Sequence, residues 1–174
     1  MPRDRKTWAS AYAKQSQSDF RVYEILVSAP QVEDCHVWHY LQMACEKIAK
    51  AYRFRDTETS IEELLTSHIA FSKCIENLLK YPAFKAKYLR QDAMFRQVSR
   101  LARRLSREIE KLAPAVDRGT SPENAEYPWA AGEKIVLPCA YSYPNLKLLK
   151  EAEGRNFLKL IRSAIMDFDQ IMPE

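Results

Sequence analysis

The sequence predicts an all-α protein, an up-and-down bundle of about five helices around one core. Only three of the 174 residues are glycine, whereas Ala, Leu, Lys, Glu and Arg, which all favour helices, are abundant. Apolar residues also recur at helical spacing through several long segments. A chain of this length buries roughly 70% of the surface that its unfolded form exposes. We therefore expect a single helical domain that covers residues 1–174.

The first two helices are expected over residues 7–28 and 34–54. Thr7 is a suitable N-cap for the first helix, and Pro30 follows its end. On the second helix an apolar face opposes a polar arc, which predicts an amphipathic helix. This helix is either an ordinary surface helix or one wall of a polar groove. The arc consists of His39, Gln42, Glu46 and Lys50.

Two more helices follow a polar connection. Residues 61–65 could add a short helical turn, after which Thr66 or Ser67 would cap a third helix that runs to about Lys80. The fourth helix is expected over residues 87–112.

Residues 113–144 are expected to form a long ordered loop before the last helix, at residues 145–171. The loop holds five of the nine prolines and two of the three glycines. Its four large aromatics, at positions 127, 129, 141 and 143, favour packing against the bundle over a mobile linker. The loop could instead cover a groove between helices where a ligand binds. Residues 134–137 are expected to be extended.

Composition excludes several classes of protein. Hydrophobic content is 47% and charged content 29%, as in ordinary globular proteins, and no run of about 18 apolar residues could span a membrane. The first residues lead into no apolar signal-peptide stretch. The four cysteines show no CxxC spacing, so we expect reduced thiols in a cytoplasmic protein. The net charge of +4 is too small to indicate nucleic-acid binding by itself.

An arginine ridge on the fourth helix is the sharpest local signal. On a helical wheel its five members fall within about 100° of arc, opposite an apolar face. These arginines repel one another, and their charge can be balanced in four ways: by solvent, by acidic residues of the same chain, by nucleic-acid phosphates or by an acidic protein partner. The ridge is defined by Arg96, Arg100, Arg103, Arg104 and Arg107.

Three segments resemble HEPN domains, small all-α modules of prokaryotic toxin–antitoxin and anti-phage systems. The segment from His39 to Ala51, which reads H-x-x-Q-x-A-x-E-K-x-x-K-A, is similar to the second helix of HEPN domains. Thr66-Ser67-His68 is similar to the start of their third helix, and Glu126-Tyr127-Pro128 to their closing segment. The resemblance covers roughly residues 7–170. It implies a HEPN-type bundle, a homodimer and a role in toxin–antitoxin or phage-defence systems.

HEPN ribonucleases carry an arginine, four to six residues and then a histidine, and this chain lacks that motif. Twelve residues separate His68 from the nearest upstream arginine, Arg55, and the other two histidines, His36 and His39, are further from theirs. A catalytic site would therefore need His39, Glu46 or His68 to meet Arg103 or Arg107 in space. The alternative for Glu46 is an ordinary i,i+4 pair with Lys50.

Other chemistry has little support in the sequence. A zinc site needs three or four ligands at matched positions, which Cys35, His36 and His39 do not provide. We therefore expect no metal site and no cofactor. Glycine-rich phosphate loops and the common hydrolase motifs are missing from the sequence.

The sequence leads to two main hypotheses for function and to a third alternative. The protein binds RNA or a nucleotide through the arginine ridge, or it uses the ridge to dock an acidic protein such as a cognate nucleotidyltransferase or antitoxin-like chain. The third hypothesis is an atypical ribonuclease.

Overall fold

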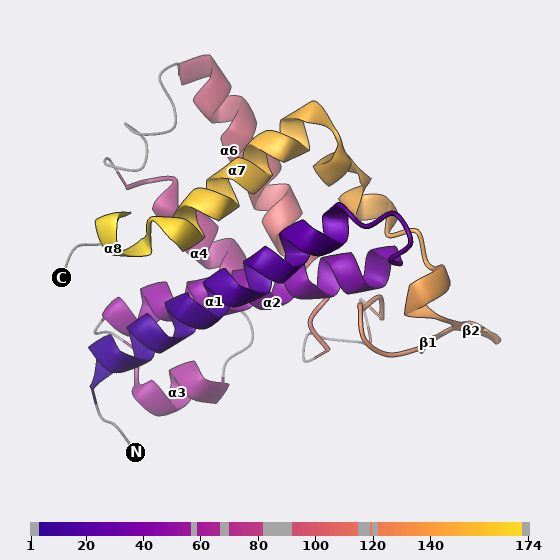
Figure 1. Ribbon diagram of the computed structural model, residues 1–174, viewed down its shortest axis with the longest axis horizontal. Coiled ribbons are helices and arrows are strands. Elements are labelled where there is room, and N and C mark those ends of the chain that lie inside the picture. Colours follow the sequence, from indigo (N-terminus) through magenta and orange to yellow (C-terminus); the bar gives the residue numbers. More distant parts are fainter. Residues whose placement is uncertain are drawn as a thin grey trace.

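The computed structural model describes residues 4–56, 59–66, 70–81, 92–114, 119 and 122–171, and it confirms the all-α class (Figure 1). Helices dominate this part of the chain, and a short hairpin accompanies them. The elements are α1 (Arg5–Val27), α2 (Asp34–Arg55), α3 (Ile61–Thr66), α4 (Phe71–Leu78), α6 (Asp92–Glu110), β1 (Trp129–Ala131), β2 (Lys134–Val136), the 3₁₀ helices η1 (Pro138–Ala140) and η2 (Pro144–Lys150), α7 (Ala152–Met166) and α8 (Phe168–Ile171).

Helix α2 is the central element. It lies along α1 and also contacts α3, α4, α6 and α7, so neighbours cover it on most sides (Figure 1). The surface-helix alternative was therefore wrong for part of the polar arc, since Gln42 and Lys50 are only 4% and 5% exposed. The wheel of a single helix shows which residues share a face but not how many neighbours enclose it. The core lies between α2, α6 and α7, around fully buried residues such as Leu41, Ile48, Leu105, Phe157 and Ile161.

Helix α1 begins two residues earlier than predicted because Asp4, and not Thr7, is its N-cap. The Asp4 carboxylate accepts hydrogen bonds from the backbone N–H groups of Lys6 and Thr7, at 3.0 and 3.2 Å. The Thr7 hydroxyl donates to the same carboxylate. These hydrogen bonds hold the Asp4 pKa below its usual value, with the Thr7 hydroxyl as the largest cause.

The third predicted helix starts later than expected and is capped from a distance. Thr66 ends α3, and α4 begins at Phe71, so the expected cap at Thr66 is wrong; Ser67 lies outside the described residues. Instead, the Glu110 carboxylate at the end of α6 accepts from the backbone N–H groups of Phe71 and Ser72, at 2.8 and 3.4 Å, and from the Ser72 hydroxyl at 2.8 Å. One acidic side chain thus takes the place of the missing local cap and fixes α4 to α6.

Replacing Glu110 with alanine should destabilise the fold by about 1–3 kcal/mol, because it removes charge-assisted hydrogen bonds to the first turn of α4. Urea unfolding followed by circular dichroism measures this change. The control is Glu133→Ala in the exposed hairpin turn, which should change stability by no more than about 0.5 kcal/mol. Equal stability of the two variants would contradict the capping role.

The last predicted helix, residues 145–171, is in fact three segments. The first is the 3₁₀ helix η2, after which Glu151 is extended with φ −91° and ψ 169°. Helix α7 then begins at Ala152, and α8 begins at Phe168. Gly154 allows the close approach of the two segments, because a Cβ atom there would lie 1.9 Å from the Leu148 carbonyl oxygen and 2.5 Å from Leu149 Cα. The first turn of α7 therefore packs directly on the backbone of η2.

Gly154→Ala should destabilise the protein by at least about 1–3 kcal/mol, since the added methyl group meets backbone that cannot move freely. Helix propensity alone predicts the opposite change in stability, because it favours alanine over glycine by about 1 kcal/mol. Thermal and urea unfolding measure the difference. Asn156→Ala, at an exposed position of the same helix, is the control and should be neutral or slightly stabilising. A Gly154→Ala variant more stable than the wild type would contradict the close-packing explanation.

Residues 122–143 precede η2 and carry the β1–β2 hairpin and η1. Tyr143 is 3% exposed and belongs to the hydrophobic core of the bundle, whereas Trp129 is 8% exposed and its ring contacts Tyr141 of the same loop. The extended stretch at 134–137 is present as β2, which pairs in antiparallel register with β1, opposing Val136 to Trp129 and Lys134 to Ala131. Gly132, with φ +63°, makes the tight turn between the two strands. The hairpin projects from one end of the molecule (Figure 1).

The fourth predicted helix is present as α6, which ends at Glu110 rather than Leu112. Its expected beginning at residue 87 lies outside the described residues.

Candidate functional site

The arginine ridge lies on the outer side of α6. Ala102, Leu105 and Ile109 are fully buried on the inner side and hold the helix against the core. All five ridge arginines are exposed, as the wheel predicts. The ridge is therefore a fixed surface feature, because the helix that carries it is anchored along its length.

Only one member of the ridge has an acidic partner in the described part of the chain. The Arg107 Nη2 atom lies 3.6 Å from the Glu76 Oε1 atom of α4. Arg96, Arg100, Arg103 and Arg104 form no ion pair with any described residue. No acidic residue in the described part of the chain therefore competes with an external anion for these four arginines.

Lys111 extends the ridge by one more cation, which the sequence analysis did not include. It follows Arg107 by four residues and therefore lies on nearly the same side. Its Nζ atom is 3.1 Å from Glu108 Oε1, and its side chain is 44% exposed. The helical spacing could have identified it.

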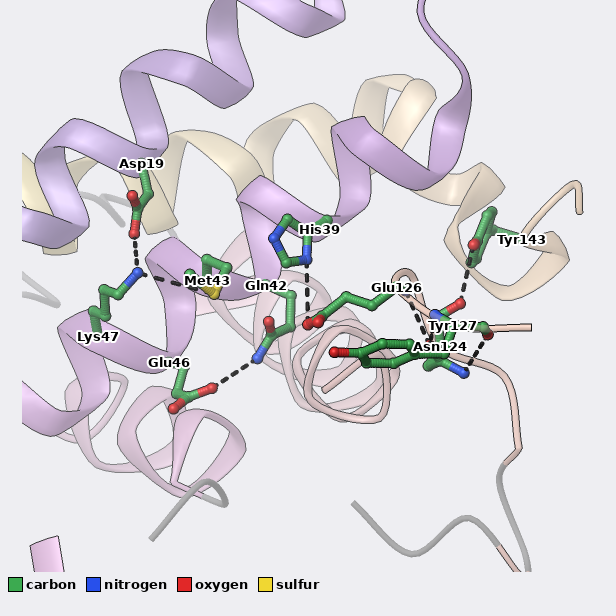
Figure 2. A network of polar contacts seen from close by, with 10 residues as sticks. All are labelled: Asp19, His39, Gln42, Met43, Glu46, Lys47, Asn124, Glu126, Tyr127 and Tyr143. Atoms are coloured by element: carbon green, nitrogen blue, oxygen red, sulfur yellow. Dashed lines mark hydrogen bonds and ion pairs between the residues drawn. The ribbon is translucent and has the colours of Figure 1, made fainter. Parts of the chain in front are cut away.

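The polar residues of α2 form a separate network, shown in Figure 2. His39 Nδ1 lies 3.4 Å from Glu126 Oε1. Further along, Gln42 Nε2 donates to Glu46 Oε2 at 3.0 Å, and Lys50 Nζ is 3.4 Å from Glu46 Oε1. The predicted Glu46–Lys50 pair is therefore confirmed, in a more buried setting than a surface helix would give it.

The structure does not join this network to the ridge. Among the described residues, neither Arg103 nor Arg107 forms a hydrogen bond or ion pair with His39 or Glu46. His68, the third catalytic candidate, lies outside the described residues. Sequence reasoning missed Glu126 as the partner of His39, since no local pattern connects a helix residue with a loop so distant in the chain.

Asn124 shapes the loop that brings Glu126 to His39 (Figure 2). Its Oδ1 atom accepts from the backbone N–H groups of Glu126 and Tyr127 at 2.9 and 2.7 Å, and its Nδ2 atom donates to the Tyr127 carbonyl at 3.0 Å. The Tyr143 hydroxyl lies 3.1 Å from the Asn124 carbonyl oxygen, and burial raises the pKa of this tyrosine. Asn124 is 2% exposed, so its side chain forms these hydrogen bonds in place of hydrogen bonds to water.

Asn124→Ala should cost about 2–3 kcal/mol of stability, because it leaves several buried or half-buried backbone groups without their partner. Urea unfolding gives the size of the loss. The exposed Asn145→Ala variant is the matched control and should behave like the wild type. A wild-type stability for Asn124→Ala would show that the loop does not depend on this side chain.

Tyr141 closes a small cavity between the end of α6 and the loop. Its hydroxyl donates to Glu123 Oε1 at 2.8 Å, and burial, aided by this carboxylate, raises its pKa to about 12. Glu108 and Lys111 line the other side. The cavity measures about 20 Å³, which leaves room for about one water molecule. This part of the loop therefore packs on the end of α6.

The described residues provide no group of three or more His, Cys, Asp or Glu side chains placed to hold a metal ion. Cys35, Cys45 and Cys74 are buried, and burial raises the pKa of each thiol, to about 12 for Cys74. Cys139 is exposed. Within the described ranges, no helix combines the length and apolar character needed to cross a membrane.

Comparison of the chain with models of known protein families, with curated proteins and with solved structures finds no match in any of the three.

Proposed function

We propose that this protein binds RNA through the arginine ridge on α6. The observation that carries the proposal is the exposure of Arg96, Arg100, Arg103 and Arg104 without an acidic partner among the described residues. Guanidinium groups bind phosphate oxygens bidentately, and a row of them on one helix face is a common footprint of nucleic-acid binding. RNA would relieve the repulsion between arginines that lie three and four residues apart.

The size of the ridge suits a short stretch of a polyanion. Arg96 and Arg107 are eleven residues apart, which corresponds to roughly 16 Å along the helix axis. Rigid attachment of α6 to the core lowers the entropy lost when the arginines bind. In keeping with the HEPN resemblance, we propose a non-catalytic role of a HEPN-type homodimer in a cytoplasmic toxin–antitoxin or phage-defence system.

Fluorescence anisotropy of a labelled mixed-sequence RNA tests the proposal. Four free arginines on one strand predict a slope of about −3 in a plot of log affinity against log salt concentration. The double variant Arg100→Glu/Arg104→Glu should lose most of this affinity. Lys14→Glu/Lys134→Glu, on α1 and β2, changes the net charge equally at exposed positions away from the ridge and should bind almost as the wild type does.

Two results would redirect the proposal. Absence of binding at low salt, together with co-purification of an acidic protein, would make the ridge a protein-docking surface. Cleavage of the RNA that is lost in His39→Ala or His68→Ala would make the protein a ribonuclease.

A further inference from the structure

We propose that the binding surface continues from α6 onto α4 and that it selects single-stranded RNA. In this arrangement Lys73 and Lys80 of the α4 segment contact phosphates beside the ridge, and the Tyr81 ring stacks on an unpaired base. The inference rests on the proposed function, because it names the class of RNA and adds a second helix to the same site.

The contacts between α4 and α6 place their outer sides next to each other. Glu110 of α6 binds the start of α4 at Phe71 and Ser72, and one helical turn further along, Glu76 reaches back to Arg107. Residue numbers thus rise along α4 while they fall along α6, so the helices run in opposite directions at this contact. The Glu76–Arg107 pair is solvent-accessible, with side-chain exposures of 26% and 65%, and therefore marks a surface boundary that the two helices share.

The outer side of the α4 segment is cationic. Lys73, Asn77 and Lys80 are exposed and follow one another at intervals of four and three residues, which places them on one side of the helix. Glu76 is the only acidic residue between positions 70 and 81, and Arg107 already pairs with it. Neither lysine forms an ion pair with any residue in the described ranges. Two packed helices lie about 8–10 Å apart, so the ridge and the two lysines form neighbouring rows of positive charge.

Tyr81 supplies the aromatic group that phosphate contacts alone lack. Tyr81 follows directly after Lys80 and is 39% exposed. Its backbone N–H donates to the Leu78 carbonyl at 3.0 Å. This hydrogen bond continues the last turn of α4 and keeps Tyr81 beside the lysine row. Aromatic side chains next to a basic groove bind single strands by stacking on bases. In a duplex the bases stack on each other, so the ring gives no comparable gain there.

The test compares a labelled single-stranded RNA of about twelve nucleotides with a blunt RNA duplex of the same length and composition. Wild-type protein should bind the single strand more tightly. Tyr81→Ala should weaken single-strand binding by about tenfold and leave duplex binding unchanged. Tyr81→Phe keeps the ring and should bind as the wild type does. Lys73→Glu/Lys80→Glu should weaken binding and make the salt slope shallower by about 1.4, the value for two lost phosphate contacts.

The outcomes separate this inference from the proposed function. If wild-type protein binds neither RNA, both fail. If the Arg100→Glu/Arg104→Glu variant loses binding while the α4 and Tyr81 variants bind as Lys14→Glu/Lys134→Glu does, the ridge acts alone and the inference is overturned. Equal or tighter binding of the duplex by the wild type also overturns it. Circular dichroism melting of each variant ensures that only folded proteins are compared.

Discussion

The enclosure of α2 is the constraint on which the rest of the structure depends. A helix with neighbours on most sides must satisfy most of its buried polar groups inside the protein, because water cannot reach them. The Ser16 hydroxyl donates to the Ala44 carbonyl at 2.7 Å, and the Tyr52 hydroxyl donates to the Ala164 carbonyl at 2.8 Å. Lys47 pairs with Asp19 of α1 (Figure 2). These bonds tie α1 and α7 to α2 in one register, which hydrophobic contact alone would not specify.

The two sides of α6 have different roles. One side of α6 completes the core around α2 and α7, and its other side is the arginine ridge. Most of the charge on α2 is compensated inside the fold, as in the Glu46–Lys50 pair, whereas among the described residues only Arg107 of the ridge has an acidic partner. This contrast is the physical basis for treating the ridge, and not the polar row of α2, as the surface that meets another molecule.

Helical periodicity allowed the sequence to predict the all-α class, the extents of α1 and α2 within a few residues, and the exposure of all five ridge arginines. Each of these depends on residues three or four apart. The features that it did not predict depend on contacts between distant segments. Glu110 caps α4 across 39 residues, and Glu126 pairs with His39. No local pattern encodes such contacts, since each partner looks ordinary within its own segment.

The capping of α4 by Glu110 has a consequence for how the protein folds. An eight-residue helix is too short to be stable alone, and the N-terminal groups of α4 find their acceptor only once α6 is in place. Formation of α4 is therefore coupled to the docking of α6, and the two helices should form and open as one cooperative unit. Because the arginine ridge lies on one member of this unit and the lysine pair on the other, the spacing between the two rows of charge is set during folding and not when a ligand arrives.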